Sequence, residues 1–197
     1  MKLAFYNALA AAGSTNGPFF DRCIEFDQHL RGNGDASRFV HVEFVFDERP
    51  LPLDGATVQA GDPGGSLCYS SSPRDGGVRF KQIDLNDGKW TVANIGLLNP
   101  ADLRLALNFC KARLGMRYDW AGILGFVLPF GEHDDQDRFC SEAALELMQR
   151  SAVNGQLPRR IAAAIAGLTP WRTSPAGLYV ALTRLAKTAL RPVEADA

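Results

Sequence analysis

The stretch RFVHVEFVF, at positions 38–46, constrains the fold of this chain more than any other. Apolar side chains occupy every second position, which is the period of a β-strand with one buried face. The wholly apolar face consists of Val40, Val42, Phe44 and Phe46. The mixed face consists of His41, Glu43 and Val45. The pattern therefore predicts a strand that is anchored in a core on one side and carries a histidine on the other.

Further strands are predicted after this one. The segments SLCYSSS (66–72) and GGVRFKQIDL (76–85) meet at PRDG, whose Pro, Asp and Gly are typical of a turn, so they predict a hairpin. KWTVANIGL (89–97) predicts one more strand. The Pro- and Gly-rich residues 48–65 are expected to form a connection.

Helical periodicity flanks this block of strands on both sides. Residues 18–31 predict a first helix, and Asn99-Pro100 predicts the start of a second that Gly115 ends. Three more helices are predicted at 138–148, between Pro158 and Gly167, and after Ser174-Pro175. Residues 117–137 are expected to be a loop.

The order of helix, strands and then helices indicates an α+β fold. We expect one domain over residues 1–190, in which a small antiparallel sheet packs against helices. Residues 191–197 are expected to form a flexible tail.

Composition excludes several classes of function. With 46% hydrophobic and 22% charged residues, the chain has the composition of a globular protein rather than a disordered one. A formal net charge of -1, without a basic stripe, offers no surface for nucleic acid. The four cysteines include no Cys-x-x-Cys pair, which argues against a zinc site or a disulfide framework and for a reducing compartment.

The N-terminal stretch MKLAFYNALAAAG resembles a signal peptide only faintly, because Tyr6 and Asn7 interrupt its short apolar run. No apolar run reaches the roughly 18 residues of a membrane span. We therefore expect the chain to be cytoplasmic on synthesis.

Cys140 lies at the start of the helix predicted over 138–148, and two interpretations are open. It can be a small core residue that begins the apolar stripe continued by Ala144 and Leu147. It can instead be a nucleophile, because a helix N-terminus and a nearby imidazole both favour a thiolate. The second interpretation requires a histidine in the right place.

The chain has three histidines, and His41 is the best candidate for that partner. His29 lies off the apolar face of its predicted helix, and His133 lies in an acidic loop that is poorly suited to hold a base. His41 lies on a strand, which is the rigid support that a catalytic base needs. Glu43, two residues further on, points to the same side and can orient the imidazole or balance its charge.

Two stretches of the chain resemble a known family. LGMRYDWAGILGF followed by RFCSEAALELM is similar to the NlpC superfamily of papain-like cysteine peptidases and amidases, through Gly115, Tyr118, Trp120, Phe139, Cys140 and Ser141. In ordinary members the histidine strand follows the cysteine helix, but no histidine follows Cys140 here. HVEFVF before FCSE is the order of the circularly permuted branch, which includes lecithin retinol acyltransferase-like proteins.

The resemblance extends over most of residues 35–185. CYSSSPRDGGVRFKQIDL and RTSPAGLYVAL are similar to stretches of permuted members found in phage and bacterial genomes. The resemblance implies a permuted papain-like fold with Cys140 as nucleophile, His41 as general base and Tyr118 beside the oxyanion.

Members of the family often carry a His, Glu, Asn or Gln on the strand after the base, as the third polar residue of the site. The matching stretch here is CYSSS, which offers Ser70 or Ser71. Either serine can accept a hydrogen bond from the imidazole, but neither stabilises an imidazolium as a carboxylate does. Glu43 is the alternative for this role.

The implied activity is hydrolysis of an amide or ester through a thioacyl-enzyme, with cell-wall peptide amides favoured and lipid acyl groups second. The backbone N–H of Cys140, with Tyr118, is expected to hold the oxyanion. No metal or organic cofactor is expected. The alternative is a structural or adaptor protein of a phage particle that kept the fold and lost turnover, with partners in the virion.

Overall fold

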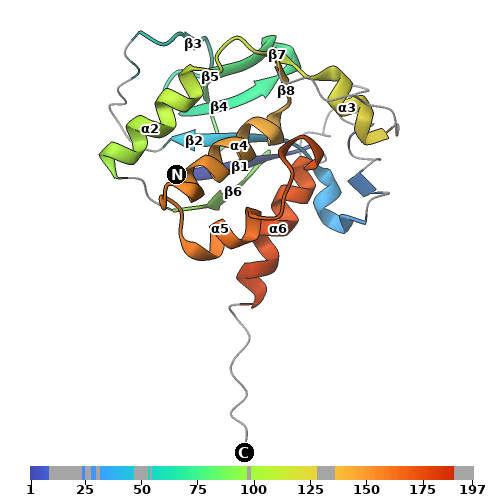
Figure 1. The fold of residues 1–197 in the computed structure, drawn as a ribbon. Helices are drawn as coiled ribbons and strands as arrows, with labels where there is room; N and C mark the ends of the chain where they lie inside the picture. The colour runs from blue at the N-terminus through green and yellow to red at the C-terminus, as the bar shows by residue number, and fades with distance from the viewer. Residues whose placement is uncertain are drawn as a thin grey trace, which may run out of the picture.

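A six-stranded sheet in the order β3-β5-β4-β2-β1-β6 forms one layer of the molecule (Figure 1). The computed structural model describes residues 1–8, 24, 28–29, 32–46, 53, 55–96, 99–127 and 136–188. The strands of the sheet are Lys2–Asn7 (β1), Phe39–Phe46 (β2), Val58–Gln59 (β3), Ser66–Ser72 (β4), Gly77–Ile83 (β5) and Trp90–Asn94 (β6). Arg117–Tyr118 (β7) and Asp137–Arg138 (β8) form a separate parallel pair.

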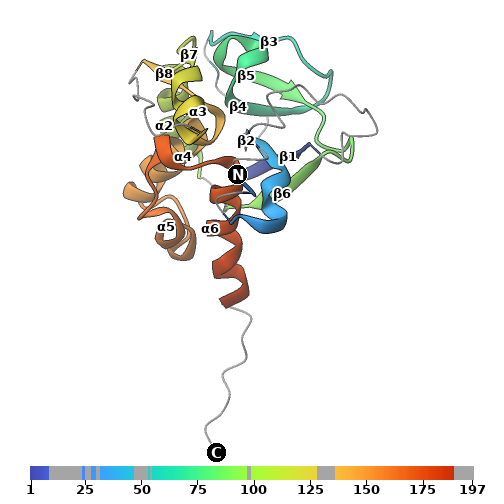
Figure 2. The ribbon, with the colours of Figure 1, turned by 90° about the vertical axis from the view of Figure 1, so that its right-hand side faces the viewer.

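Helices make up the second layer, which lies on one side of the sheet (Figure 2). The α-helices are Pro100–Lys111 (α2), Trp120–Val127 (α3), Cys140–Val153 (α4), Arg159–Ile165 (α5) and Pro175–Thr188 (α6). Short 3-10 turns occur at Gly34–Arg38, Pro73–Asp75 and Pro170–Arg172. In the described part of the chain, no helix has the length and apolar character to cross a membrane.

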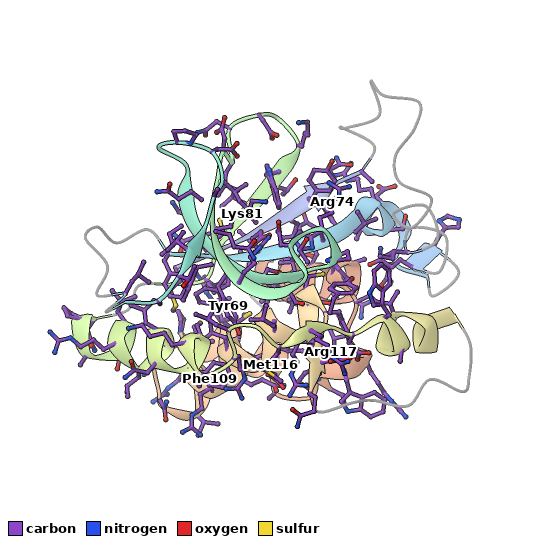
Figure 3. The ribbon with its side chains drawn as sticks, turned by 90° about the horizontal axis from the view of Figure 1, so that it is seen from above. Tyr69, Arg74, Lys81, Phe109, Met116 and Arg117 are labelled. Atoms are coloured by element: carbon purple, nitrogen blue, oxygen red, sulfur yellow. The ribbon has the colours of Figure 1, made fainter. Side chains whose placement is uncertain are left out.

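The core lies between these two layers, and α4 is its centre. This helix packs against β2 and β4, and also against α2, α5 and α6. The apolar face predicted for β2 is buried, with Val42, Phe44 and Phe46 inside the core. Tyr69 lies on the helix side of the sheet together with Phe109 of α2, whereas Lys81 lies on the opposite side (Figure 3). One face of the sheet therefore packs against the core, and the other face carries side chains such as Lys81 that lie away from the helices.

Most of the predicted elements are confirmed. The strand at 39–46, the hairpin of β4 and β5, and the helices α2, α4, α5 and α6 all lie where the sequence predicts them. The side chain of Asn99 caps α2 by accepting a hydrogen bond of 2.9 Å from the backbone N–H of Asp102. The α+β class is thus confirmed.

The predicted antiparallel sheet is wrong at one edge, because β3 runs parallel to β5. Strand β3 precedes β4 and is turned back into it by the glycine-containing segment 61–65, so both β3 and β5 run opposite to β4. The prediction of a plain connection over 48–65 missed this short strand.

Further elements were not expected, namely β1, α3 and the short pair of β7 and β8. Residues 2–7, considered only as a faint signal peptide, form β1, which pairs with β2 on one side and β6 on the other. The predicted loop at 117–137 contains α3, whose first turn is closed by a 2.6 Å hydrogen bond from the N–H of Gly122 to Asp119. Most of the helix predicted at 18–31, His133 and the tail at 191–197 lie outside the described residues.

Candidate active site

The end of β2 that carries His41 lies where the sheet opens. Strands β2 and β4 pair only from Phe44 to Phe46, although β4 continues to Ser72. Beyond the paired region, Ser71 turns to another element, because its hydroxyl donates a 2.5 Å hydrogen bond to the carbonyl of Arg138. The residues just before α4 are thereby held beside the start of β2.

The N-terminus of α4 is fixed by bonds on both sides of Cys140. The carbonyl of Arg138 also accepts a 3.1 Å bond from the N–H of Asp119, and the carboxylate of Glu142 accepts one of 3.4 Å from the N–H of Phe139. Phe139 is extended, so the helix begins at Cys140 itself. The backbone N–H groups of a first turn have no partner within the helix and point along its axis.

A close backbone contact places this assembly against the sheet. The N–H of Val78 at the start of β5 donates a 2.8 Å bond to the carbonyl of Met116, and the N–H of Gly115 donates one of 3.0 Å back to Val78. A Cβ on Gly77 would collide with the carbonyl of Met116, and Gly77 has a φ of 137°. Glycine is therefore required at the point where the segment leading to Tyr118 crosses the hairpin.

His41 and Cys140, about a hundred residues apart in the sequence, lie close enough for the thiol to shift the pKa of the imidazole. Burial lowers the pKa of His41, but the charge of Cys140 and a hydrogen bond with its thiol, followed by a hydrogen bond with Glu43, raise it to about 10. The thiol is almost covered, since Cys140 is 2% exposed. The pair is thus arranged so that the imidazole can hold the thiol proton as an imidazolium.

Glu43 is the carboxylate behind the imidazole. Its Oε1 lies 2.7 Å from Nε2 of His41, which leaves the other ring nitrogen for Cys140. The side chain of Glu43 is completely buried. Burial raises the pKa of Glu43, but the charge and hydrogen bonds of Arg79, followed by those of His41, lower it to about 2. Glu43 is therefore ionised, as a partner of an imidazolium should be.

The remaining predicted site residues lie near this pair in different roles. The hydroxyl of Ser70 donates a 2.7 Å bond to the carbonyl of Val42, and Glu43 is the partner of the imidazole. Of the candidates for the third polar residue, Glu43 bonds to His41, whereas the hydroxyls of Ser70 and Ser71 bond to the backbone carbonyls of Val42 and Arg138. Tyr118 is buried at the end of β7, and its ring packs edge-on against Trp120 at 5.1 Å.

A cleft of about 520 Å³ opens over His41. Two aromatic pairs line it: Tyr6 with Trp90, whose centroids are 5.2 Å apart, and Tyr118 with Trp120. Its polar wall comes from the hairpin and includes Arg74 and Lys81, which lie on the side of the sheet away from α2 (Figure 3). A cleft with aromatic walls on one part and a strongly charged wall on another can hold a small molecule or peptide that carries polar groups.

Sequence reasoning missed Arg79, which binds Glu43 through two hydrogen bonds of 2.7 and 2.6 Å. It also missed Asp75 and Trp90, whose ring lies 6.3 Å from that of His41. The signal for Arg79 was available in part, because the PRDG turn sets Arg79 opposite Ser70 on the hairpin. The pairing of β4 with β2 was needed to bring Arg79 to Glu43.

Among the residues that the structure describes, no group of three or more His, Cys, Asp or Glu side chains is arranged to hold a metal ion. His29 is exposed, and His133 is outside the described residues. Comparisons of the chain with protein-family models, with curated proteins and with solved structures found no match.

Proposed function

We propose that this protein is a thiol hydrolase that cleaves amide or ester bonds through Cys140, His41 and Glu43. The observation that carries the proposal is the close approach of a helix-terminal thiol to an imidazole that is itself bonded to a buried carboxylate. Nucleophile, base and orienting acid in this order are the parts that acyl transfer needs. The order of the strand and helix in the chain further supports a permuted papain-like fold.

The proposed reaction begins with the proton of Cys140 already on His41, because the raised pKa of His41 keeps its imidazole protonated at neutral pH. The thiolate forms a bond to the carbonyl carbon of the substrate, and the π electrons of the carbonyl move onto its oxygen. The backbone N–H groups at the start of α4 stabilise this oxyanion, with Tyr118 beside them. Collapse of the intermediate breaks the bond to the leaving amine or alcohol, which receives the proton from His41.

The second half of the reaction releases the acyl group. Water attacks the thioester carbonyl while His41 accepts its proton, the carbon–sulfur bond breaks, and the thiolate is regenerated beside the protonated His41. Glu43 stabilises the imidazolium in both halves. On the basis of the family resemblance, we propose cell-wall peptide amides as the substrate class.

One observation favours the alternative of a non-catalytic structural or adaptor protein. Cys140 is only 2% exposed, so a substrate carbonyl can reach the sulfur only if the surrounding side chains move. A protein that keeps the site as part of its core would show the same burial. Activity and assembly measurements separate the two.

The test compares wild type, Cys140→Ala and Cys68→Ala on peptidoglycan fragments and model esters. Cys68 is also a buried cysteine that is in no disulfide, but it lies in the small cluster with Ala4 and Val45 rather than at His41, so it is the matched control. We expect Cys140→Ala to lose turnover completely, Cys68→Ala to retain it, and a thioacyl adduct to be detected on Cys140 by mass spectrometry. His41→Ala should lower the rate by about 10²–10⁴-fold. Turnover absent from all variants, with stable incorporation into a larger assembly, would support the adaptor instead.

A further inference from the structure

Arg79 lies between two carboxylates and is almost completely buried. Its two terminal nitrogens bond to both oxygens of Glu43, and its Nε donates a 2.9 Å bond to Asp75. Its side chain is 5% exposed. A guanidinium whose fork is matched to one carboxylate in this way is held in a single orientation, and it holds the carboxylate as well.

Ser70 explains how Arg79 reaches Glu43 from the far strand. Arg79 is the register partner of Ser70 on β5, and continuing the β2–β4 register by one residue beyond Phe44 and Tyr69 brings Glu43 next to Ser70. The arginine must therefore extend across β4 over this position. A serine leaves room for it, whereas a long side chain would fill the same space. The small size of Ser70 therefore matters here in addition to the hydrogen bond that its hydroxyl donates to Val42.

The contacts connect six side chains in a line from α4 to the hairpin turn. Each member can carry a charge opposite in sign to that of its neighbours. The members in order are Cys140, His41, Glu43, Arg79, Asp75 and Lys81, the last pair being joined at 2.8 Å. The side chain of Lys81 is 29% exposed, so the line begins at a buried thiol and ends at solvent.

We propose that Arg79 is a positioning residue of this site: it keeps Glu43 ionised and aims its Oε1 at His41, and Asp75 keeps Arg79 in place. This inference rests on the proposed function only in taking His41 as the catalytic base. Without Arg79, the carboxyl of Glu43 would be buried beside one imidazole, and burial favours its protonated form. A protonated Glu43 no longer stabilises the imidazolium.

The sign of the effect on His41 distinguishes this role from a direct one. Arg79 is a cation, so acting directly it would repel an imidazolium and lower the pKa of His41. Acting through Glu43, it raises that pKa, because it preserves the negative charge next to the ring. Removal of Arg79 therefore changes the pKa of His41 in opposite directions under the two mechanisms.

Other groups near His41 must stay constant in the comparison. Tyr6 is its register partner on β1, Glu43 shares β2, and Cys140 approaches from α4. The remaining titratable or charged groups around the cleft are Asp62, Arg74, Asp75, Arg79, Lys81 and Tyr118. Only Arg79 is changed in the principal variant, and its size is approximated by methionine.

The experiment is an NMR pH titration of the full chain with labelled imidazole carbons, where only three histidines need assignment. We expect Arg79→Met to lower the pKa of His41 by about 1 to 3 pH units, the range for loss of a close opposite charge. Arg79→Lys should restore part of this loss. Arg117→Met, which removes an exposed arginine paired with Asp137, is the matched control and should leave His41 unchanged. An unchanged or raised pKa of His41 in folded Arg79→Met overturns the proposal.

A second comparison applies if Arg79→Met does not fold. Glu43→Gln and the double variant Glu43→Gln/Arg79→Met should give the same pKa of His41, because Arg79 then has no carboxylate to act through. A higher pKa in the double variant would show direct repulsion and overturn the proposal. Neither titration contains a substrate. The result for Arg79 therefore does not depend on whether the protein hydrolyses a substrate in the assays above.

Discussion

Two networks of buried charge lie close to Cys140. Each contains a buried glutamate, and the pKa of that glutamate is lowered in one network and raised in the other. In the first, Glu43 accepts bonds of 2.7 and 2.6 Å from the two terminal nitrogens of Arg79, while Asp75 takes only the Nε. In the second, along the first turns of α4, Glu142 shares Arg138 with Glu146, and the Nε of Arg138 lies 3.6 Å from Glu142 but 3.0 Å from Glu146. Both glutamates are buried.

Because both glutamates are buried, the difference between their pKa values follows the geometry of their arginine contacts. Arg79 holds the pKa of Glu43 at about 2 against the effect of burial. For Glu142, burial and the nearby charge of Glu146 outweigh Arg138 and raise the pKa to about 8. An arginine stabilises a buried carboxylate well when both of its terminal nitrogens bond to that carboxylate, and poorly when two carboxylates share its Nε, as Glu142 and Glu146 share that of Arg138. The first network can therefore serve an imidazolium, while the second holds a group that is protonated at neutral pH.

The largest expected difference is in the cost of removing each arginine. Arg79→Met should lower the free energy of unfolding by about 3–5 kcal/mol, because it removes both bonds from Arg79 to the buried Glu43 and leaves His41 as the remaining side-chain partner of that carboxyl. Arg138→Met should cost about half as much near pH 6, since Glu142 is already protonated there and Glu146 is partly solvated. Urea unfolding of both variants at pH 6 measures the difference. Equal losses of unfolding free energy would mean that Arg79 stabilises its buried glutamate no better than Arg138 does.

Acid should weaken the first network specifically. The folded pKa of Glu43 is lowered to about 2 from a usual 4.5, so its contribution is fully present above pH 4.5 and is lost as the pH falls towards 2. The loss is on the order of 3 kcal/mol over that window. Unfolding of wild type and of Glu43→Gln/Arg79→Met at pH 5 and pH 3 should show a smaller fall in the double variant. Parallel curves would contradict the assignment of the acid sensitivity to Glu43.

These networks also mark the boundary of what the sequence could predict. The two faces of β2, the hairpin and the start of α4 were predictable, because two-residue alternation, turn residues and helical spacing are local signals. The same alternation placed His41 and Glu43 on one side and made Glu43 a candidate partner. Cys140 was singled out by its place before an apolar stripe.

The missing parts depend on contacts between distant strands. Arg79 meets Glu43 only because β4 lies between β5 and β2, and an arginine on a strand carries no local sign of its partner. The sequence does not distinguish β1, because Leu3 and Phe5 belong to an apolar N-terminal stretch, although in the structure they alternate into the core. The helix α3 was missed because its residues are apolar almost throughout and show little periodicity.

Raising the pH should weaken the second network, because its protonated Glu142 then loses its proton. The folded pKa of Glu142 is raised from 4.5 to about 8, so folding is favoured by its proton below pH 4.5 and this contribution is lost as the pH rises through 8. Glu142→Gln removes the titration and keeps an oxygen that can accept from the N–H of Phe139. We expect the variant to be more stable than wild type at pH 8.5 by on the order of 1–3 kcal/mol, and less so at pH 5. A variant that is destabilised equally at both pH values would show that Glu142 acts as a capping group alone.

The smallest effect should come from an arginine outside both networks. Arg117 pairs with Asp137 at 3.0 Å, a distance similar to the buried contacts, but its side chain is 74% exposed. Water and salt screen such a pair, and the loss of side-chain freedom offsets much of the attraction, so exposed pairs contribute about 0.2–1 kcal/mol. Arg117→Met should therefore lower the free energy of unfolding by no more than about 1 kcal/mol, with little dependence on pH between 4 and 8. Comparing this variant with Arg79→Met and Arg138→Met separates the effect of contact distance from that of burial. If Arg117→Met loses as much free energy of unfolding as Arg79→Met, contact distance alone sets the strength of these pairs. The buried, matched contact of Arg79 would then have no special part in holding Glu43 ionised.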